Sequence, residues 1–500
     1  MKEHFKFYLF ITLATLLVGI GFTSADFFTS PVHNFKDSFI LFLQWGILVM
    51  ALWSVIYLIS LNKYVFALLY PLICLFSSIL AYFRYTMGTT LTTVILEVFF
   101  DNHSQTTLIS PILILVVVLS LLCAVLVVIY RFRNITIHHI LLNSIIAFLL
   151  FVLLFNIPRI KHPLSERIPF NLYFITVQYF SQKKEALTER SVLSKDVTSC
   201  GEDQIVVLIL GESLRADHLA FNGYERNTTP YLSQEDIISF PTIFSEYTHT
   251  NASVPHILTR ADSLNPDLAY QERSFVDLLK QCGFYTVWLA NQQPNKSYIY
   301  FMNECDTLIY ANANKSAYVF DKWVDGDLLP AFDSFIQNDD RQFILMHTIG
   351  SHWYYNSHFP DAFQKYTPIT NSRIVKSNTR EEMINSYDNT ILYTDYFWHE
   401  IINRLRDKKA VLIYLSDHGE ALGENGVWLH ATDADPIHYP ACWIWMSPQY
   451  KADNPEKYQA LQENKANHYR TDFLFHTILQ AVDIQSDVID ATFSLFTVSP

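Results

Sequence analysis

Four short apolar runs of the chain are each followed by side chains that can bind a metal ion or move a proton. The runs are residues 205–210, 286–289, 343–346 and 410–415. The polar residues that follow them are, in chain order, Glu212, Asn291 with Gln292 and Gln293, His347 with His352, and Asp417 with His418. A helix N-cap explains any one of these residues alone, but a metal site explains all four groups together. We therefore expect them to meet in one site.

The residue types at these positions select among metal ions. Carboxylate and imidazole ligands together suit Zn²⁺, whereas Mg²⁺ and Ca²⁺ prefer shells made of oxygen alone, and Mn²⁺ remains compatible. His430 lies twelve residues beyond His418, on a loop that begins at Gly423, so it can reach the same pocket. The alternative for His430 is a capping or surface histidine. The pattern predicts a zinc site lined by carboxylate and imidazole groups.

The four runs are themselves the elements that must position these side chains. Each is short, unbroken and β-rich, which is typical of strands buried on both faces of a parallel sheet. Helical patterns lie between them, including residues 272–281 and 387–407. This alternation predicts an α/β domain with a mostly parallel sheet. In such sheets ligands bind beyond the carboxyl ends of the strands, which is where the polar residues fall.

The charged residues are unevenly distributed along the 500-residue chain. Only 17% of the residues are charged, and residues 1–158 hold 12 of the 83 charged side chains, with a net charge of +2. The total of −13 leaves −15 for the rest of the chain, which is typical of an acidic globular domain and argues against nucleic acid as a partner. This composition excludes a purely soluble enzyme, a disordered chain and a small disulfide-stapled domain.

Five stretches lack acidic and basic residues and are long enough to cross a bilayer as helices. They are residues 7–24, 38–62, 64–83, 107–130 and 135–158. A charge at the bilayer centre costs about 3 kcal/mol on insertion scales, which explains why the charged residues stop where these runs begin. A buried core helix would explain one such run, but five within residues 1–158 predict a transmembrane domain. Because no small-residue cleavage site follows the first run closely, we expect an uncleaved anchor rather than a signal peptide.

The basic residues between the predicted spans indicate their orientation. Those on one side are Lys2, Lys6, Lys63, Arg131 and Arg133, and those on the other are Lys36 and Arg84. The positive-inside rule then places the N-terminus in the cytoplasm and, after an odd number of spans, the residues beyond 158 outside. We expect residues 159–199 to form a linker along the membrane surface, for which a solvated linker is the alternative, and residues 200–500 to form an external domain.

Three segments resemble the bacterial phosphoethanolamine transferases of the alkaline phosphatase/sulfatase superfamily. Residues 206–230 resemble the family's first metal motif, with its Gly-Glu-Ser and its later Gly-Tyr and Thr-Thr-Pro residues. Residues 416–430 match the C-terminal motif almost residue for residue. Residues 248–255 resemble the nucleophile segment, in which a threonine stands five positions before a proline, and that threonine is Thr250 here. The resemblance covers nearly the whole chain and implies a sulfatase-like catalytic domain behind five membrane spans.

The resemblance also implies roles for individual residues. The implied zinc ligands are Glu212, Thr250, Asp417 and His418. Thr250 is the implied nucleophile, and metal coordination is one way to activate its weakly nucleophilic hydroxyl. The residues implied to contact the transferred phosphoethanolamine are Thr248, Gln292 and Lys296, with His352 and His430 as further catalytic groups. His347 falls in the matching His-x-x-Gly-Ser-His stretch and is grouped with the substrate-binding residues. Gln292 departs from the family, which more often has asparagine there.

The implied reaction moves phosphoethanolamine from phosphatidylethanolamine to an outer-leaflet glycolipid, lipid A or the lipopolysaccharide core, through a covalent intermediate on Thr250. The resemblance implies a multi-pass protein of the bacterial inner membrane with a periplasmic catalytic domain, and we expect a monomer. A glycerophosphate transferase similar to lipoteichoic acid synthase is the alternative enzyme, and a catalytically inactive membrane sensor is the alternative from another class. A sulfatase would need Cys/Ser-x-Pro-x-Arg, but the segment that begins at Ser253 lacks the arginine.

The cysteines give a separate expectation. Cys74 and Cys123 lie in predicted spans, and the four external cysteines are Cys200, Cys282, Cys305 and Cys442. Family members often bracket the nucleophile with a disulfide, but Tyr247 and His256 stand near those places. Since sequence alone cannot pair four cysteines, we expect them to be unpaired and the fold to depend on its hydrophobic core.

Overall fold

The computed structural model divides the chain into two units, which are described separately. It describes residues 2–28, 34–87, 91–93, 95–96, 100, 111–194, 196–197, 199–313, 315, 322–337, 341–430 and 432–497. One unit comprises Met1–Phe180 with Ala313–Asp321, and the other comprises Ser181–Asn312 with Lys322–Pro500. The main division therefore falls inside residues 159–199, the segment that the sequence predicts as a linker.

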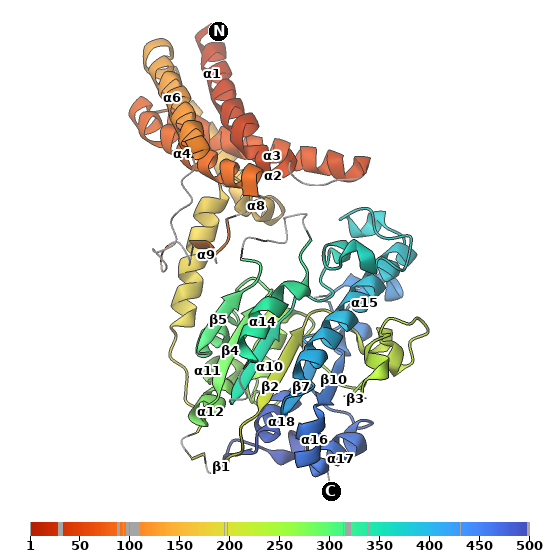
Figure 1. Cartoon of the computed structure of the whole chain (residues 1–500). Coiled ribbons are helices and arrows are strands. Elements are labelled where there is room, and N and C mark those ends of the chain that lie inside the picture. The colour runs from red at the N-terminus through yellow and green to blue at the C-terminus, as the bar shows by residue number, and fades with distance from the viewer. Residues whose placement is uncertain are drawn as a thin grey trace. The chain divides into compact units, whose positions relative to one another are not determined.

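The first unit is helical (Figure 1). Its helices are α1 (Lys2–Val18), the π-helical turn η1 (Gly19–Thr23), α2 (Ala25–Phe28), α3 (Phe35–Ser60), α4 (Lys63–Met87), α6 (Pro111–Asn134), α7 (Ile140–Asn156) and α8 (Pro158–Ser165). Helix α9 (Asn171–Ala186) carries the chain from this unit into the other. Apolar side chains cover most of the exposed helix surface, as expected for helices that face lipid rather than water.

Four segments of this unit are long and apolar enough to span a membrane. They are Glu3–Phe27, Phe35–Ser60, Lys63–Thr86 and Pro111–Asn134. A fifth span is obtained only if Ile140–Asn156 and Pro158–Ser165, which are bent by 82° at Ile157, count as one. The prediction of five spans is therefore confirmed as four to five. Residues 107–110, with which the fourth predicted span begins, lie outside the described residues.

A buried polar contact holds three of these helices together. Asn143 on α7 accepts hydrogen bonds at Oδ1 from the hydroxyls of Tyr8 on α1 and Tyr57 on α3, and Asn143 is 3% exposed. Its Nδ2 donates to the carbonyl of His138 at 2.8 Å. Because a polar group facing lipid would be costly, this contact specifies how α1, α3 and α7 face one another.

The second unit is built on a seven-stranded sheet. Its strands are β2 (Ile205–Gly211), β3 (Ile237–Ser239), β4 (Tyr285–Ala290), β5 (Thr307–Tyr310), β6 (Gln342–His347), β7 (Ala410–Ser416) and β10 (Cys442–Met446). Their order is β3-β10-β7-β2-β6-β4-β5, and β10 runs antiparallel to both β3 and β7, whereas the remaining pairs are parallel. The four predicted strands are the adjacent strands β7, β2, β6 and β4, with bounds extended by one or two residues. The mostly parallel α/β sheet is thus confirmed, and β3, β5 and β10 are additional.

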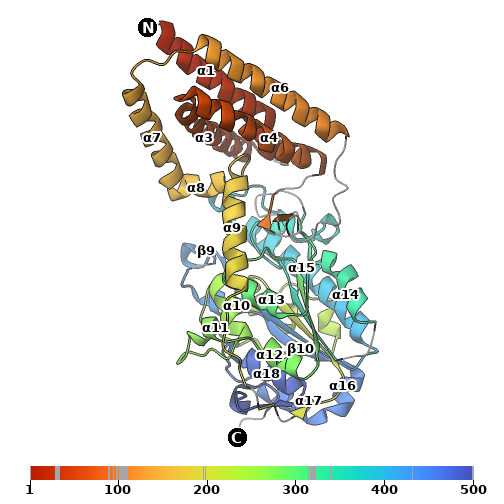
Figure 2. The ribbon, with the colours of Figure 1, turned by 90° about the vertical axis from the view of Figure 1, so that its left-hand side faces the viewer.

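Alternate residues of the central strands belong to two hydrophobic cores. Val206, Leu208 and Leu210 pack into one core, which contains side chains of α10, α12 and α18. Ile205, Val207 and Ile209 pack into the other, which contains side chains of α14 and α15. Figure 2 shows the two groups of helices on opposite sides of the sheet. The sheet is therefore buried on both faces, which explains why its strands are continuous apolar runs.

Nine further α-helices, two short strand pairs and several 3₁₀ turns make up the rest of the described part of this unit. The helices are α10 (Thr250–Leu258), α11 (Leu268–Gln271), α12 (Val276–Gln281), α13 (Ile299–Glu304), α14 (Leu329–Phe335), α15 (Arg380–Leu405), α16 (Pro448–Asp453), α17 (Pro455–Asn464) and α18 (Phe473–Ala481). The antiparallel pairs are β1 (Ser199–Cys200) with β11 (Ile484–Gln485), and β8 (Ala421–Leu422) with β9 (Trp428–Leu429).

Two predicted helices have different starts in the structure. Helix α12 begins later than predicted, at Val276 rather than at residue 272. Helix α15 begins earlier, at Arg380 rather than at residue 387, because Thr379 and Glu382 form a capping box that satisfies its first backbone N–H groups.

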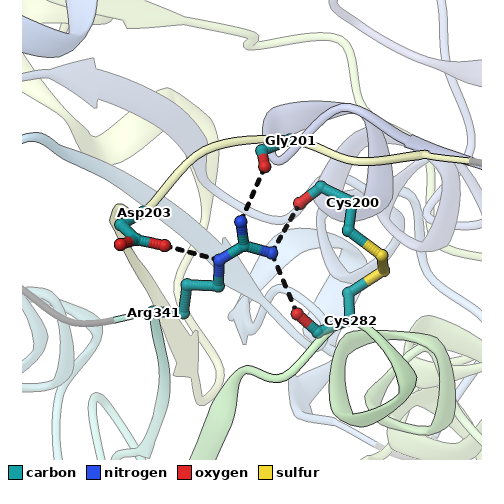
Figure 3. The surroundings of a disulfide bond; sticks show 5 residues. All are labelled: Cys200, Gly201, Asp203, Cys282 and Arg341. Carbon is teal, nitrogen blue, oxygen red and sulfur yellow. Dashed lines mark hydrogen bonds and ion pairs between the residues drawn. A yellow bond between two sulfur atoms is a disulfide. The ribbon is translucent and has the colours of Figure 1, made fainter.

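The expectation that the external cysteines are unpaired is wrong for one pair. Cys200 and Cys282 form a disulfide that joins β1 to the turn between α12 and β4, whereas Cys305 and Cys442 are free and buried. Arg341 lies against this disulfide and donates to Asp203 and to the carbonyls of Cys200, Gly201 and Cys282 (Figure 3). The two half-cystines are 82 residues apart, so only the sheet topology brings them together.

Candidate functional site

The end of β2 places a carboxylate at the centre of the sheet. Gly211 is the last residue of the strand, and a Cβ there would collide with the hydroxyl of Tyr414 on the neighbouring β7. The next residue, Glu212, is 1% exposed. Its backbone carbonyl accepts a hydrogen bond from Ser351 N at 3.0 Å, which ties it to the loop after β6. The Glu212 carboxylate is therefore fixed beyond the carboxyl ends of β2 and β6.

Two side chains from other elements donate to one oxygen of this carboxylate. Thr250, the first residue of α10, donates from Oγ1 to Glu212 Oε2 at 2.9 Å. Gln292, which follows β4, donates from Nε2 to the same oxygen at 3.0 Å and to the carbonyl of Thr348 at 3.1 Å. The implied nucleophile and an implied substrate-binding residue thus meet at Glu212.

The end of β7 adds a second carboxylate and an imidazole. Asp417 and His418 are both completely buried. His418 Nε2 lies 3.4 Å from Asp417 Oδ2 and 3.5 Å from Glu212 Oε1. Burial and the neighbouring Glu212 carboxylate raise the pKa of Asp417 well above its ordinary value. Two carboxylates in one dry site repel each other, so a cation between them would be strongly favoured.

The chemistry of this group fits a zinc ion. Among the described residues, Asp417 Oδ2 and His418 Nε2 have no hydrogen-bond partner although they are buried. Orphaned polar atoms of this kind are costly unless something binds them. Single ligand atoms of Glu212, His418 and His430 also lie within 4.8 Å of one another. Carboxylate oxygens, imidazole nitrogens and a hydroxyl form a donor set that Zn²⁺ accepts.

A second layer of polar residues surrounds His430, which directly follows β9. His430 Nδ1 lies 2.9 Å from Glu420 Oε2, and Glu420 Oε1 accepts a hydrogen bond from the Tyr355 hydroxyl at 2.8 Å. Burial lowers the pKa of His430, but the carboxylates of Glu420, Glu212 and Asp417 together outweigh burial and raise it to about 9. The His430 ring centroid is 4.6 Å from that of His418 and 5.7 Å from that of His352.

A buried aspartate holds the loops that end β4 and β6. Asp325 is 2% exposed and accepts hydrogen bonds from Asn291 Nδ2 at 2.7 Å and from the backbone N–H groups of Ile349 and Gly350 at 2.8 and 3.0 Å. Gly350 has φ +49°, and a Cβ there would lie 2.7 Å from the carbonyl oxygen of Glu212. Glycine is therefore required where this loop passes the Glu212 backbone.

Comparison with known proteins identifies the fold family. A family model described as sulfatase matches residues 204–484, more than half of the chain. The chain belongs to the sulfatase family. The Cys/Ser-x-Pro-x-Arg pattern that a sulfatase needs is incomplete in this chain. Its candidate serine, Ser253, is buried inside α10, and the arginine is missing.

Within this family the chain is similar to phosphoethanolamine transferases. It is 31% identical over 306 residues to phosphoethanolamine transferase EptA of Escherichia coli, an alignment that covers 57% of this chain and 54% of that protein. The chain therefore spans about half the length of the curated relative that it matches.

Two solved structures from Neisseria meningitidis have a similar fold. The integral membrane lipooligosaccharide phosphoethanolamine transferase A covers 97% of this chain and 98% of its own chain, with a TM-score of 0.54 and 24% identity. The soluble domain of lipooligosaccharide phosphoethanolamine transferase A covers 62% of this chain and 96% of its own, with a TM-score of 0.53 and 27% identity. The helical unit and the α/β unit both have counterparts in the first of these.

The site beyond the carboxyl ends of β2, β6 and β7 contains most of the site residues that the sequence predicts. Glu212, Thr250, Gln292, Asp417, His418, His430 and His352 come together as described above. Thr248 is half-buried two residues before α10, and Lys296 is exposed on the loop between β4 and α13. Within the described part of the chain, neither makes a hydrogen bond or an ion pair, so their contact with the transferred group stays a prediction.

His347 lies beneath the site rather than at its surface. It is 1% exposed, and its ring packs edge to face against Trp288 and Tyr298 at centroid distances of 5.6 and 5.2 Å. Burial lowers its pKa to about 4, so the imidazole is neutral at physiological pH. Neither ring nitrogen has a hydrogen-bond partner among the described residues, so the contact of His347 with a substrate stays a prediction.

The sequence analysis did not single out three polar residues that form hydrogen bonds to residues of this site. Ser213 and Glu420 belong to the matched motifs, so their positions next to Glu212 and two residues after His418 could have drawn attention to them. Asp325 carries no comparable signal, because it lies on a loop far along the chain from the residues that it holds. Its role depends on β4 and β6 being neighbours in the sheet.

Proposed function

We propose that the chain transfers phosphoethanolamine from phosphatidylethanolamine to an outer-leaflet glycolipid, the acceptor being lipid A or the lipopolysaccharide core. The observation that carries this proposal is the contact between Thr250 Oγ1 and Glu212 Oε2, in a site with a second carboxylate and three histidines. Thr250 is the first residue of α10, where the positive end of the helix dipole favours a phosphoryl group. The similarity of the chain to phosphoethanolamine transferases supports the same reaction class.

In this proposal Glu212, Thr250, Asp417 and His418 hold one Zn²⁺ ion. When bound, the ion would lower the pKa of the threonine hydroxyl and neutralise charge on the phosphoryl oxygens. The hydrogen bond from Thr250 Oγ1 to Glu212 Oε2 orients the hydroxyl before the reaction. Gln292, bonded to the same carboxylate oxygen, lies where it can contact the bound phosphoethanolamine.

The first step forms a bond between Thr250 Oγ1 and the phosphorus atom of phosphatidylethanolamine, and the hydroxyl proton passes to Glu212 Oε2, to which Thr250 already donates. The bond from phosphorus to the glycerol oxygen breaks, and that oxygen takes up a proton to give diacylglycerol. His430, held in place by Glu420, is the candidate donor of this proton, and His352 lies beside it. In the second step an acceptor hydroxyl or protonated phosphate attacks the same phosphorus atom and gives its proton to His430, and Thr250 is released as it takes its proton back from Glu212.

The helical unit and the α/β unit have different roles in this proposal. We propose that residues 1–158 span the inner membrane, that residues 159–199 link the units, and that residues 200–500 form the catalytic domain in the periplasm. Donor and acceptor are both membrane lipids, so the spans keep the site beside its substrates. The Cys200–Cys282 disulfide supports a periplasmic location, because disulfides persist in oxidising compartments.

Mass spectrometry of envelope glycolipids tests this function. Cells that express the chain should contain glycolipids heavier by one phosphoethanolamine group, and cells that express Thr250→Ala should not. An increment equal to glycerophosphate would indicate the other transferase class. Unchanged glycolipids in the presence of the folded wild-type protein would contradict the proposal.

A further inference from the structure

Ser213 has a backbone conformation that glycine would adopt with less strain. Its φ is +58°, in the left-handed region, and the residue is completely buried. A residue with a Cβ pays about 1–2 kcal/mol to adopt this conformation. A buried position that keeps a strained serine where glycine would fit indicates that the side chain itself is needed.

Hydrogen bonds from α15 and from the end of β7 hold the turn at Ser213 in place. The Tyr387 hydroxyl on α15 donates to the Ser213 carbonyl at 2.7 Å and accepts from Arg215 N at 2.9 Å. Leu214 N donates to Ser416 Oγ at 2.9 Å. The turn is thus fixed by α15 and by the end of β7, so its strain is supported by the surrounding fold.

From this position Ser213 contacts both buried carboxylates. Its hydroxyl donates to Glu212 Oε1 at 2.7 Å, and its backbone N–H donates to Asp417 Oδ1 at 3.2 Å. These bonds leave Glu212 Oε2 facing Thr250 and Asp417 Oδ2 facing His418 Nε2. Asp417 Oδ1 also accepts from His418 N at 2.8 Å, so Ser213 is one of the groups that set which carboxylate oxygens face the interior of the site, and its hydroxyl is the side chain bonded to Glu212 Oε1.

We propose that Ser213 is a positioning residue for the metal centre, whose hydroxyl orients Glu212 while its strained backbone orients Asp417. This inference rests on the proposed function, because it assumes that the two carboxylates bind zinc. The residue itself touches no substrate. Groups that orient metal ligands by hydrogen bonds raise metal affinity by about 10- to 100-fold.

Two substitutions distinguish the effect of the Ser213 hydroxyl from the effect of its backbone strain. Ser213→Ala removes the hydroxyl and keeps the strain, whereas Ser213→Gly removes both. Ser447→Ala is the matched control, because Ser447 is also a completely buried serine but caps α16, which is outside the site, by accepting from Tyr450 N. The measurements are zinc affinity, by competition with a chelating dye, and the melting temperature of the metal-free protein, both on the full-length chain in detergent.

We expect both Ser213 variants to bind zinc at least about tenfold more weakly than the wild type. Ser213→Gly should melt at or above the temperature of Ser213→Ala, since relief of strain offsets the added chain entropy of glycine. Ser447→Ala should melt lower and bind zinc with unchanged affinity. If Ser213 had only a structural role, its replacement by glycine would not weaken zinc binding while leaving the melting temperature of the metal-free protein unchanged.

The outcomes distinguish this inference from the proposed function. A wild-type protein that binds zinc, a Glu212→Ala variant that does not, and Ser213 variants within about twofold of wild-type affinity would overturn the role of Ser213 alone. A wild-type protein that binds no zinc would overturn both. Affinity that falls in proportion to the melting temperature across all three serine variants would also overturn the positioning role.

Discussion

Thr250 Oγ1 lies 2.9 Å from Glu212 Oε2, although the two residues are 38 positions apart and belong to different elements. Glu212 is fixed by the end of β2, and Thr250 is fixed by the start of α10. The pair therefore has one geometry set by the sheet and by a helix packed on it. A hydroxyl held against a buried carboxylate is the arrangement expected of an activated nucleophile.

The first prediction concerns the hydroxyl of Thr250. Thr250→Val keeps the shape of the side chain and removes the oxygen, so we expect transfer to fall by at least about a thousandfold and no covalent adduct to form. Thr250→Ser keeps the oxygen and should retain measurable activity. Incubation with phosphatidylethanolamine followed by peptide mass spectrometry would detect phosphoethanolamine on residue 250.

Thr242 provides a control for this prediction, because its hydroxyl lies on the surface and donates to the Asn467 carbonyl. Thr242→Val should leave both activity and adduct unchanged. An adduct on a different residue, or full activity in Thr250→Val, would remove Thr250 from its role.

The second prediction concerns metal removal. Glu212→Gln and Asp417→Asn each replace a carboxylate that we propose binds zinc by an amide of the same size, so both should lose bound zinc and transfer activity. A strong chelator should have the same effect on the wild type, and added zinc should restore activity to the wild type alone. Elemental analysis and a turnover assay on the purified full-length protein measure these effects.

Asp333→Asn is the matched control, since Asp333 is a half-exposed carboxylate that pairs with Arg404 at 2.7 Å. Its zinc content and activity should equal those of the wild type. Stoichiometric zinc in Glu212→Gln would exclude Glu212 as a ligand.

Some features of the fold and of the site follow from local sequence patterns, whereas others depend on contacts between distant residues. The strands β2, β4, β6 and β7 were predictable, because a strand buried on both faces must be a continuous apolar run. Glu212 and Asp417 were predictable for the same reason, since each directly follows such a strand. Any side chain in that position is delivered to the same edge of the sheet.

Other features depend on contacts that no local pattern encodes. The turn with the positive φ at Ser213 is bonded at its carbonyl to the hydroxyl of Tyr387, which lies 174 positions away. The Cys200–Cys282 pair requires the topology of the whole sheet, so composition alone gave the wrong expectation of free cysteines. His347 is the last residue of β6, whereas Asp417 follows β7, and the rings of Trp288 and Tyr298 pack edge to face against it.

The third prediction concerns the disulfide. Cys200 and Cys282 close a loop of 82 residues, and a cross-link of that length stabilises the folded state by about 4 kcal/mol through restriction of the unfolded chain. The double variant Cys200→Ser/Cys282→Ser should therefore melt at a clearly lower temperature. A reductant should lower the melting temperature of the wild type to a similar value and leave the double variant unchanged.

Cys123→Ser serves as the control, because Cys123 is free and exposed on α6. It should melt as the wild type does. Equal melting temperatures for the oxidised wild type and the double variant would show that the cross-link does not stabilise the folded chain.

The fourth prediction concerns the pH dependence of stability at Asp395, far from the site. Asp395 is completely buried on α15 and accepts backbone N–H bonds from Tyr231 at 2.8 Å and Leu232 at 3.0 Å. Burial outweighs these bonds and raises its pKa to about 7. Between pH 4 and 7 the folded chain therefore keeps a proton that the unfolded chain releases. Its contribution to the free energy of unfolding must fall as the pH rises through this window.

Asp395→Asn removes this titration, so the melting temperature of the wild type minus that of the variant should decrease steadily from pH 4 to pH 7. Asp236→Asn is the matched control, because Asp236 pairs with Lys451 at 2.6 Å and its hydrogen bonds lower its pKa. A group with a lowered pKa titrates below this window, so its difference should stay constant between pH 4 and 7. A difference for Asp395→Asn that stays constant or rises with pH would show that Asp395 is already ionised in the folded chain at pH 4.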